Sequence, residues 1–201
     1  FPALVPPTAE VVDPRRGRGA IRCVFCGTLY PRLRTPDFAL ELFAKLDDPD
    51  VRLTMVGRGW EHFAPQAEAA RRALDGRAEL SGPVAPAHAK TLAGQAEVLL
   101  SLGNAVDNQI PSKLFEYFGA GKPILHLSVS DGDAALPYLK RYPLALVLRA
   151  ADGATPEVVA GLRAWLHRSA GKSLSYAQAA AIFPEFTPEA VARRFVQVAS
   201  R

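Results

Sequence analysis

One segment of the sequence, residues 108–125, brings together side chains that suit a phosphorylated ligand. It runs Asn-Gln-Ile-Pro-Ser-Lys-Leu-Phe-Glu-Tyr-Phe-Gly-Ala-Gly-Lys-Pro-Ile-Leu. Pro111 is typical of the first turn of a helix, where backbone amides have no partner within the helix. Those amides, the hydroxyl of Ser112, the ammonium group of Lys113 and the positive end of the helix dipole together favour the binding of a diphosphate.

Glu116 follows Lys113 by three residues, so both side chains lie on the same side of the predicted helix. A carboxylate there can accept hydrogen bonds from both hydroxyls of a ribose whose phosphates rest on the helix start. The alternative is an ordinary surface ion pair between Lys113 and Glu116, worth about 0.3 kcal/mol. The residues alone leave both interpretations open.

Apolar, β-rich runs alternate with helical patterns along the chain and define the elements that must position these side chains. Strands are predicted at residues 21–26, 51–56, 78–80, 97–102, 123–127 and 144–148. Helices are predicted from a capping Thr35, at 61–74 and 86–95, from Pro111, and at 131–141, 156–168, 173–182 and 188–200. This alternation predicts parallel β-α-β units, and continuous apolar runs indicate strands covered on both faces.

The expected fold class is therefore α/β, a single Rossmann-like, doubly wound parallel sheet of about six strands with helices on both faces. We place this domain at residues 20–201, after a proline-rich linker at residues 1–19. In such a sheet, ligands bind outside the carboxyl ends of the strands. Glycines that allow a close backbone approach follow the first four predicted strands, at Gly27, Gly57, Gly59, Gly82 and Gly103.

Several other kinds of site are not supported by the sequence. No G-x-G-x-x-G follows the first strand and no G-x-x-x-x-G-K-S/T occurs, so the dinucleotide fingerprint and the P-loop are absent. The net charge is +4, and the one dense basic cluster, residues 14–19, is interpreted as a solvated linker. Because the remaining basic residues are scattered, a nucleic-acid partner is not expected.

Cys23 and Cys26 form a C-x-x-C motif within a predicted strand, where residues three apart face opposite sides. Redox motifs of this type begin a helix instead, so we interpret these residues as two ordinary buried thiols. A reducing, cytoplasmic location is consistent with that interpretation. The four histidines are far apart in the sequence, so no metal site is expected.

The segment from Pro111 to Leu125 resembles the donor-binding helix of GT-B-fold glycosyltransferases, notably the bacterial group 1 enzymes that build surface polysaccharides. The resemblance covers about residues 20–130, and it extends to the strands and glycine turns at Phe25–Leu29, Arg52–Gly59, Glu79–Val84 and Ala96–Leu102. It implies that Glu116 binds the nucleotide ribose, and that Ser112 and Lys113 meet the diphosphate.

The resemblance also implies roles for residues outside this helix. Gly27 and Thr28 would face the phosphates, Arg34 would be a basic phosphate ligand, and Val84 would flank the base. The sequence departs from the family pattern at two positions. Asn108 stands where many relatives have a second glutamate that contacts the donor sugar, and Thr28 stands where many have arginine. These departures bear on the identity of the sugar and on the stereochemical outcome.

GT-B enzymes have two Rossmann-like domains, with the acceptor site and catalytic base mainly on the N-terminal one. The resemblance implies that this chain is the C-terminal, donor-binding domain, and its lack of a methionine before Met55 fits a piece of a longer protein. We expect a nucleoside-diphosphate sugar of the UDP or GDP type as donor, no cofactor or metal, and no certain catalytic residue in this part. The implied partner is the missing N-terminal domain, and the full-length enzyme would at most associate peripherally with the inner face of the membrane.

Two alternatives use the same fold. A nucleotide-sugar epimerase needs its own catalytic acids and histidines, which the loops after the strands do not supply. A non-enzymatic α/β binding module would leave Lys113 and Glu116 as a surface pair and would show no thermal shift with any nucleoside diphosphate. The predicted terminal helix at residues 188–200 has an apolar stripe, Val191, Phe195 and Val198, that can pack on its own domain or on the missing one.

Overall fold

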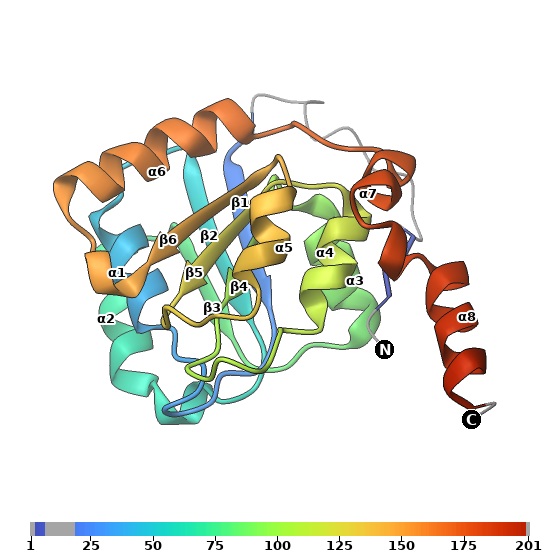
Figure 1. Ribbon diagram of the computed structural model, residues 1–201. Coiled ribbons are helices and arrows are strands. Elements are labelled where there is room, and N and C mark those ends of the chain that lie inside the picture. The colour runs from blue at the N-terminus through green and yellow to red at the C-terminus, as the bar shows by residue number, and fades with distance from the viewer. Residues whose placement is uncertain (1–2, 7–18, 200–201) are drawn as a thin grey trace.

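The protein folds around one parallel sheet, seen in a computed structural model that describes residues 3–6 and 19–199 (Figure 1). The strands of this described part are β1 (Ile21–Cys26), β2 (Val51–Val56), β3 (Ala78–Ser81), β4 (Val98–Leu102), β5 (Ile124–Ser128) and β6 (Ala145–Arg149). Their order is β3-β2-β1-β4-β5-β6, with every neighbouring pair parallel. The strand order reverses between β1 and β4, which is the topological switch point of a doubly wound sheet.

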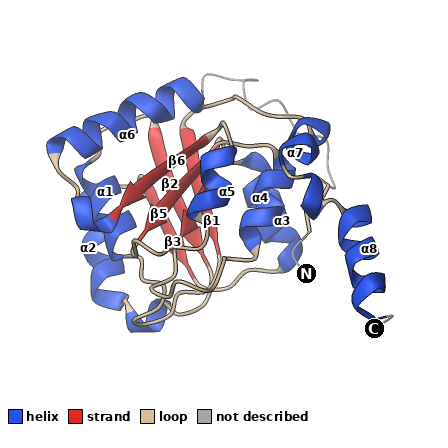
Figure 2. Ribbon diagram, in the orientation of Figure 1, coloured by secondary structure: helices blue, strands red, loops and turns tan. Residues whose placement is uncertain are grey.

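Helices cover both faces of the sheet (Figure 2). One face carries α1 (Asp37–Lys45), α2 (Ala64–Leu74) and α6 (Pro156–Ser169). The other carries α3 (Pro86–Gln95), α4 (Lys113–Ala120), α5 (Leu136–Arg141) and α7 (Tyr176–Ile182). Two separate apolar cores result, one on each side, and the predicted fold class is confirmed.

Strand β1 shows why the apolar runs are continuous. Cys23 and Phe25 belong to the core under α1 and α2, whereas Val24 and Cys26 belong to the core under α3 and α4. Both cysteines are buried and free, so the interpretation of the C-x-x-C motif as ordinary thiols on opposite faces is confirmed. Burial raises the pKa of both thiols, which keeps them protonated.

The predicted strands are confirmed to within a residue or so at each end, but several helix starts are wrong. Thr35 does not cap α1, because the helix begins at Asp37 and its N-cap is Pro36, which has no capping side-chain bond. The predicted helix at 61–74 is two elements, a 3₁₀ turn (Trp60–His62) and then α2. Gly59, in the left-handed region at φ 97°, turns the chain into this extra element.

Two helices near the predicted site also begin later than expected. Helix α4 starts at Lys113 rather than Pro111, with Ser112 as its N-cap. Helix α5 starts at Leu136 rather than at residue 131. The delay has a clear cause, because the Asp133 carboxylate accepts the backbone N–H of Ala135 and holds the chain in a loop until that point.

The start of the described chain packs against the domain. Leu4 is buried, and its N–H donates to the carbonyl of Phe186 at 2.7 Å. A Cβ added to Gly119 in α4 would lie 2.3 Å from the carbonyl oxygen of Val5. Residues 3–6 of the predicted linker therefore contact the second core, while residues 7–18, with most of the basic cluster, lie outside the described residues.

Helix α8 (Pro188–Ala199) projects away from the sheet (Figure 1). Phe195 and Val198 of its predicted apolar stripe are 61% and 59% exposed and belong to neither core. Val191, the first residue of the stripe, is partly buried, so the exposure of the stripe is greatest toward the end of the helix. Within the described ranges, no helix is long and apolar enough to cross a membrane.

Gly119→Ala is expected to lower the free energy of unfolding by about 1–3 kcal/mol, because its methyl group must displace the Val5 backbone. Gly161→Ala in α6 is the matched control. Its added Cβ would have no neighbour within 4 Å, so it should raise stability by about 0.5–1 kcal/mol. Urea denaturation measures both, and equal effects of the two substitutions would contradict the contact between residues 3–6 and α4.

Candidate functional site

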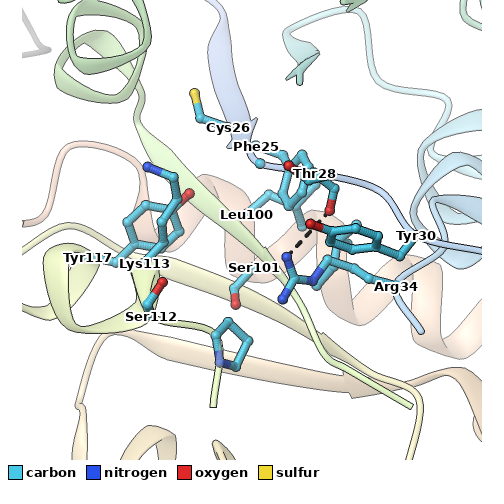
Figure 3. Close-up of a pocket in the computed structure, with 13 residues that line it drawn as sticks. Phe25, Cys26, Thr28, Tyr30, Arg34, Leu100, Ser101, Ser112, Lys113 and Tyr117 are labelled. Atoms are coloured by element: carbon cyan, nitrogen blue, oxygen red, sulfur yellow. Dashed lines mark hydrogen bonds between the residues drawn. The ribbon is translucent and has the colours of Figure 1, made fainter. Parts of the chain in front are cut away.

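A pocket of about 220 Å³ opens at the carboxyl end of the sheet, at the switch point between β1 and β4 (Figure 3). Its walls are the end of β1 and the loop after it, residues 100–102 of β4, and the start of α4. Five of the eight residues predicted to bind a donor line it, namely Gly27, Thr28, Arg34, Ser112 and Lys113.

The start of α4 provides hydrogen-bond donors to the pocket. The first hydrogen bonds of this turn run from the Leu114 N–H to the carbonyl of Pro111 and from the Phe115 N–H to that of Ser112, at 3.0 and 3.3 Å. The amides of Ser112 and Lys113 precede these bonds, at the positive end of the helix dipole. Ser112 is exposed and its side chain caps nothing, so its hydroxyl can turn toward a ligand.

Arg34 enters the pocket from the opposite side and is fixed in place. Its backbone pairs with Tyr30 in a short antiparallel bridge. Its Nε donates to Asn104 Oδ1 at 3.0 Å, and its Nη1 donates to the carbonyl of Thr28 at 3.4 Å, so the guanidinium group points into the pocket (Figure 3). Burial lowers the pKa of Arg34 from its ordinary value, but a guanidinium stays charged at neutral pH.

Asn104 is a site residue that the sequence analysis missed. It is buried, and its Nδ2 donates to both the carbonyl and the side-chain oxygen of Gln109 at 3.3 and 3.2 Å. Asn104 thus connects Arg34 to the loop that leads into α4. The signal available in the sequence was its position, directly after a buried strand and Gly103.

The glycines after β2 serve the packing of the chain rather than the pocket. A Cβ on Gly57 would lie 1.5 Å from the Gly27 carbonyl oxygen, and a Cβ on Gly59 would lie 2.2 Å from that of Leu29. Both glycines have positive φ, at 153° and 97°. They let the β2 turn press against the β1 loop, which positions Gly27 and Thr28.

Three predicted site residues lie outside this pocket. Glu116 is exposed on α4, with its Oε2 3.7 Å from Lys113 Nζ, so the expected pair on one helix side is present. Val84 is partly buried against the second core, in the loop after β3. Asn108 is exposed in the loop before α4.

Three buried polar residues, Ser101, His126 and Asp133, form a series of hydrogen bonds that ends at the pocket. The sequence analysis missed this series as well. Ser101 lines the pocket, and its Oγ lies 3.0 Å from His126 Nδ1. His126 Nε2 lies 2.8 Å from Asp133 Oδ2. Ser101 and His126 are direct partners in the register of β4 and β5. Each is a polar residue within an apolar strand, which was the only signal in the sequence.

The hydrogen bonds around Asp133 keep its carboxyl group in the charged form. Burial alone would raise the pKa of the Asp133 carboxyl. Hydrogen bonds from His126, Ala135 and Ser128 lower this pKa by more than burial raises it, so the pKa lies below its ordinary value. In the described part of the chain, no group of three or more His, Cys, Asp or Glu side chains could hold a metal ion.

Comparisons with known proteins place this architecture. No protein-family model and no curated protein matches the chain. Among solved structures, it is similar to AviGT4, a glycosyltransferase involved in avilamycin A biosynthesis (TM-score 0.58, 18% identity), over 99% of this chain and 57% of that one. The chain has the fold of a GT-B glycosyltransferase domain.

Two further structures share this glycosyltransferase fold. The lipopolysaccharide outer core galactosyltransferase WaaB aligns with a TM-score of 0.65 and 16% identity, over 96% of this chain and 52% of that one. The pneumococcal O-GlcNAc transferase GtfA, solved with UDP and GlcNAc, aligns with a TM-score of 0.63 and 16% identity, over 98% of this chain and 38% of that one. The chain thus spans about half, or less, of the length of these proteins.

The lowered pKa of Asp133 predicts a pH dependence of stability. A carboxyl whose pKa is lower in the folded state stabilises the fold above its unfolded pKa of about 3.9, and this contribution is lost as the pH falls through the folded pKa. Asp133→Asn should therefore destabilise the domain at pH 6, by an amount that shrinks toward pH 3. Urea midpoints across this range test the prediction, with Asp75→Asn at an exposed position as the control. A difference between wild type and Asp133→Asn that does not vary with pH would contradict it.

Proposed function

We propose that this chain is the donor-binding domain of a glycosyltransferase, which moves a sugar from a nucleoside-diphosphate sugar to an acceptor. The observation that carries the proposal is the pocket at the switch point, which Arg34 and Lys113, the first residue of α4, both line. Two cations and free helix amides around one cavity suit a ligand with two adjacent phosphates.

The reaction needs this arrangement because the bond to the sugar breaks with negative charge on the departing diphosphate. Donors that are already in place stabilise such charge without a cost of reorganisation. Arg34 meets this condition, because Asn104 and Thr28 fix its guanidinium group before any ligand binds. Gly27 and Thr28 would bring backbone and hydroxyl groups to the same phosphates, and no metal is part of the proposal.

Glu116 would bind the ribose, one helical turn beyond the phosphates. The 3.7 Å ion pair with Lys113 keeps the carboxylate on the side of α4 that carries the pocket's cation. With a donor bound, the Lys113 ammonium would lie between a phosphate and this carboxylate. Val84 would flank the base and Asn108 would face the sugar.

The comparisons support the kind of ligand. GtfA was solved with UDP and GlcNAc and shares the fold, which favours a donor of the UDP type, with GDP as the alternative. Because the chain spans 57% of AviGT4 and 52% of WaaB, we propose that a further domain carries the acceptor site and that this part alone transfers nothing. Synthesis of a surface polysaccharide or glycoconjugate in the cytoplasm is the proposed setting.

Calorimetry with UDP and GDP tests the ribose assignment. Glu116→Ala is expected to weaken binding about tenfold, because two hydrogen bonds to a charged acceptor are lost. The control is Glu68→Ala, which removes another exposed glutamate that pairs with an arginine on its own helix, at 2.8 Å from Arg72. Equal affinities of wild type and Glu116→Ala would overturn the role of Glu116.

Arg34→Gln tests the phosphate site independently. It should weaken UDP or GDP binding by about tenfold or more, and the remaining binding should depend less on salt because one charge contact is gone. Arg72→Gln removes an exposed arginine far from the pocket and should change neither. Failure of the wild-type chain to bind either nucleotide would overturn the proposed function in favour of a plain α/β module.

A further inference from the structure

Ser101 occupies a distinctive place at the base of the pocket. It is the one polar residue of β4 (Val98–Leu102), it is only 4% exposed, and it lines the cavity next to the start of α4 (Figure 3). Its Oγ faces two environments, since the pocket lies on one side and His126 Nδ1 lies 3.0 Å away on the other. What this oxygen presents to a ligand therefore depends on which atom carries the proton between Ser101 and His126.

The contacts of Asp133 fix one of the two hydrogen positions on the His126 ring. Its Oδ1 accepts the Ala135 N–H at 2.9 Å, and its Oδ2 lies 2.8 Å from His126 Nε2. A carboxylate only accepts hydrogen bonds, so Nε2 carries a hydrogen. In a neutral imidazole Nδ1 is then an acceptor, and the Ser101 hydroxyl must donate to it. With the imidazole neutral, the Ser101 oxygen presents only lone pairs to the pocket, and these repel phosphate oxygens.

We propose that Ser101 contacts a phosphate of the bound donor and that His126 takes up one proton from solvent when the donor binds. This inference rests on the proposed function, because it requires a diphosphate in the pocket. The added proton sits on Nδ1, which then donates to Ser101 Oγ. The Ser101 hydroxyl is released and donates its own hydrogen to a phosphate oxygen. No covalent bond other than the new N–H bond changes.

The charges around His126 fit such a proton uptake. Asp133, from the loop after β5, is the carboxylate that would stabilise the imidazolium at 2.8 Å. Ser128 on β5 and Ser101 on β4 are neutral. Across the pocket, Arg34 and, from α4, Lys113 and Tyr117 line the cavity. Phosphates in this cavity would add negative charge next to Ser101, the partner of His126 Nδ1.

The surroundings also shield the chain of hydrogen bonds from water. His126 is fully buried and Asp133 is 3% exposed. A Cβ on Gly103 would lie 2.5 Å from Asp133 Oδ2, so the backbone after β4 packs directly against the carboxylate. A proton that His126 takes up is then held within this series of hydrogen bonds, between Asp133 and Ser101.

Calorimetry with UDP-glucose at neutral pH measures the proton directly, in two buffers of different ionisation enthalpy. Both phosphates of this probe are esterified, so it lacks the terminal phosphate of UDP, whose last proton would titrate near neutral pH by analogy with phosphate monoesters, at about pH 6. Wild type should take up close to one proton per ligand bound. Ser101→Ala and His126→Gln should bind more weakly and take up less, whereas Ser130→Ala, a serine bonded to Asp107 outside the pocket lining, should behave as wild type.

A second measurement uses the wild-type protein alone and does not depend on the folding of a variant. Nitrogen-15 spectra of labelled histidine should show His126 Nδ1 unprotonated in the free protein and protonated when UDP-glucose is saturating. Binding with no proton uptake, equal uptake in Ser101→Ala, or an unprotonated Nδ1 in the complex would overturn this inference and leave the proposed function intact. No binding of UDP-glucose, UDP or GDP by the wild type would overturn both.

Discussion

Two apolar cores press on the sheet from opposite sides and confine the polar chemistry of the domain to the strand ends. Strand β1 alternates its side chains between these cores, with Cys23 on one side and Cys26 on the other. A sheet covered in this way has almost no place for a ligand along its faces. Where the strands end, the chain leaves both cores at once, and at the switch point the loops diverge and leave a cavity. The pocket with Arg34 and Lys113 occupies this place.

Much of the fold follows from patterns that are local in the sequence. Continuous apolar runs and regular turns predicted the strands well, because burial on both faces leaves little freedom in where a strand begins and ends. Helix starts were less predictable. The start of α5 depends on the Asp133 carboxylate and its bond to the Ala135 N–H, and the turn before α2 depends on how Gly59 packs against Leu29. These contacts join residues whose proximity becomes visible only in three dimensions.

The residues of the site were also predictable from the sequence only in part. Ser112 and Lys113 were predictable because a helix start has a recognisable sequence and a known electrostatic character. Asn104 and His126 were not, because their roles come from partners 70 and 25 residues away in the sequence, Arg34 and Ser101. A polar residue in a buried strand signals that some partner must satisfy it. The sequence does not say which one, since strand order and register decide that.

The contact between residues 3–6 and α4 connects the start of the described chain to the helix that faces the pocket. Val5 lies against Gly119 near the end of α4, and Lys113 at the other end of the same eight-residue helix lines the pocket. One short helix thus contacts residues 3–6 near its end and the pocket at its start. Leu4 is also tied to the Phe186 carbonyl, just before α8. Residues 3–6 therefore join two parts of the domain that are distant in the sequence, the helix whose start faces the pocket and the segment that leads into the terminal helix.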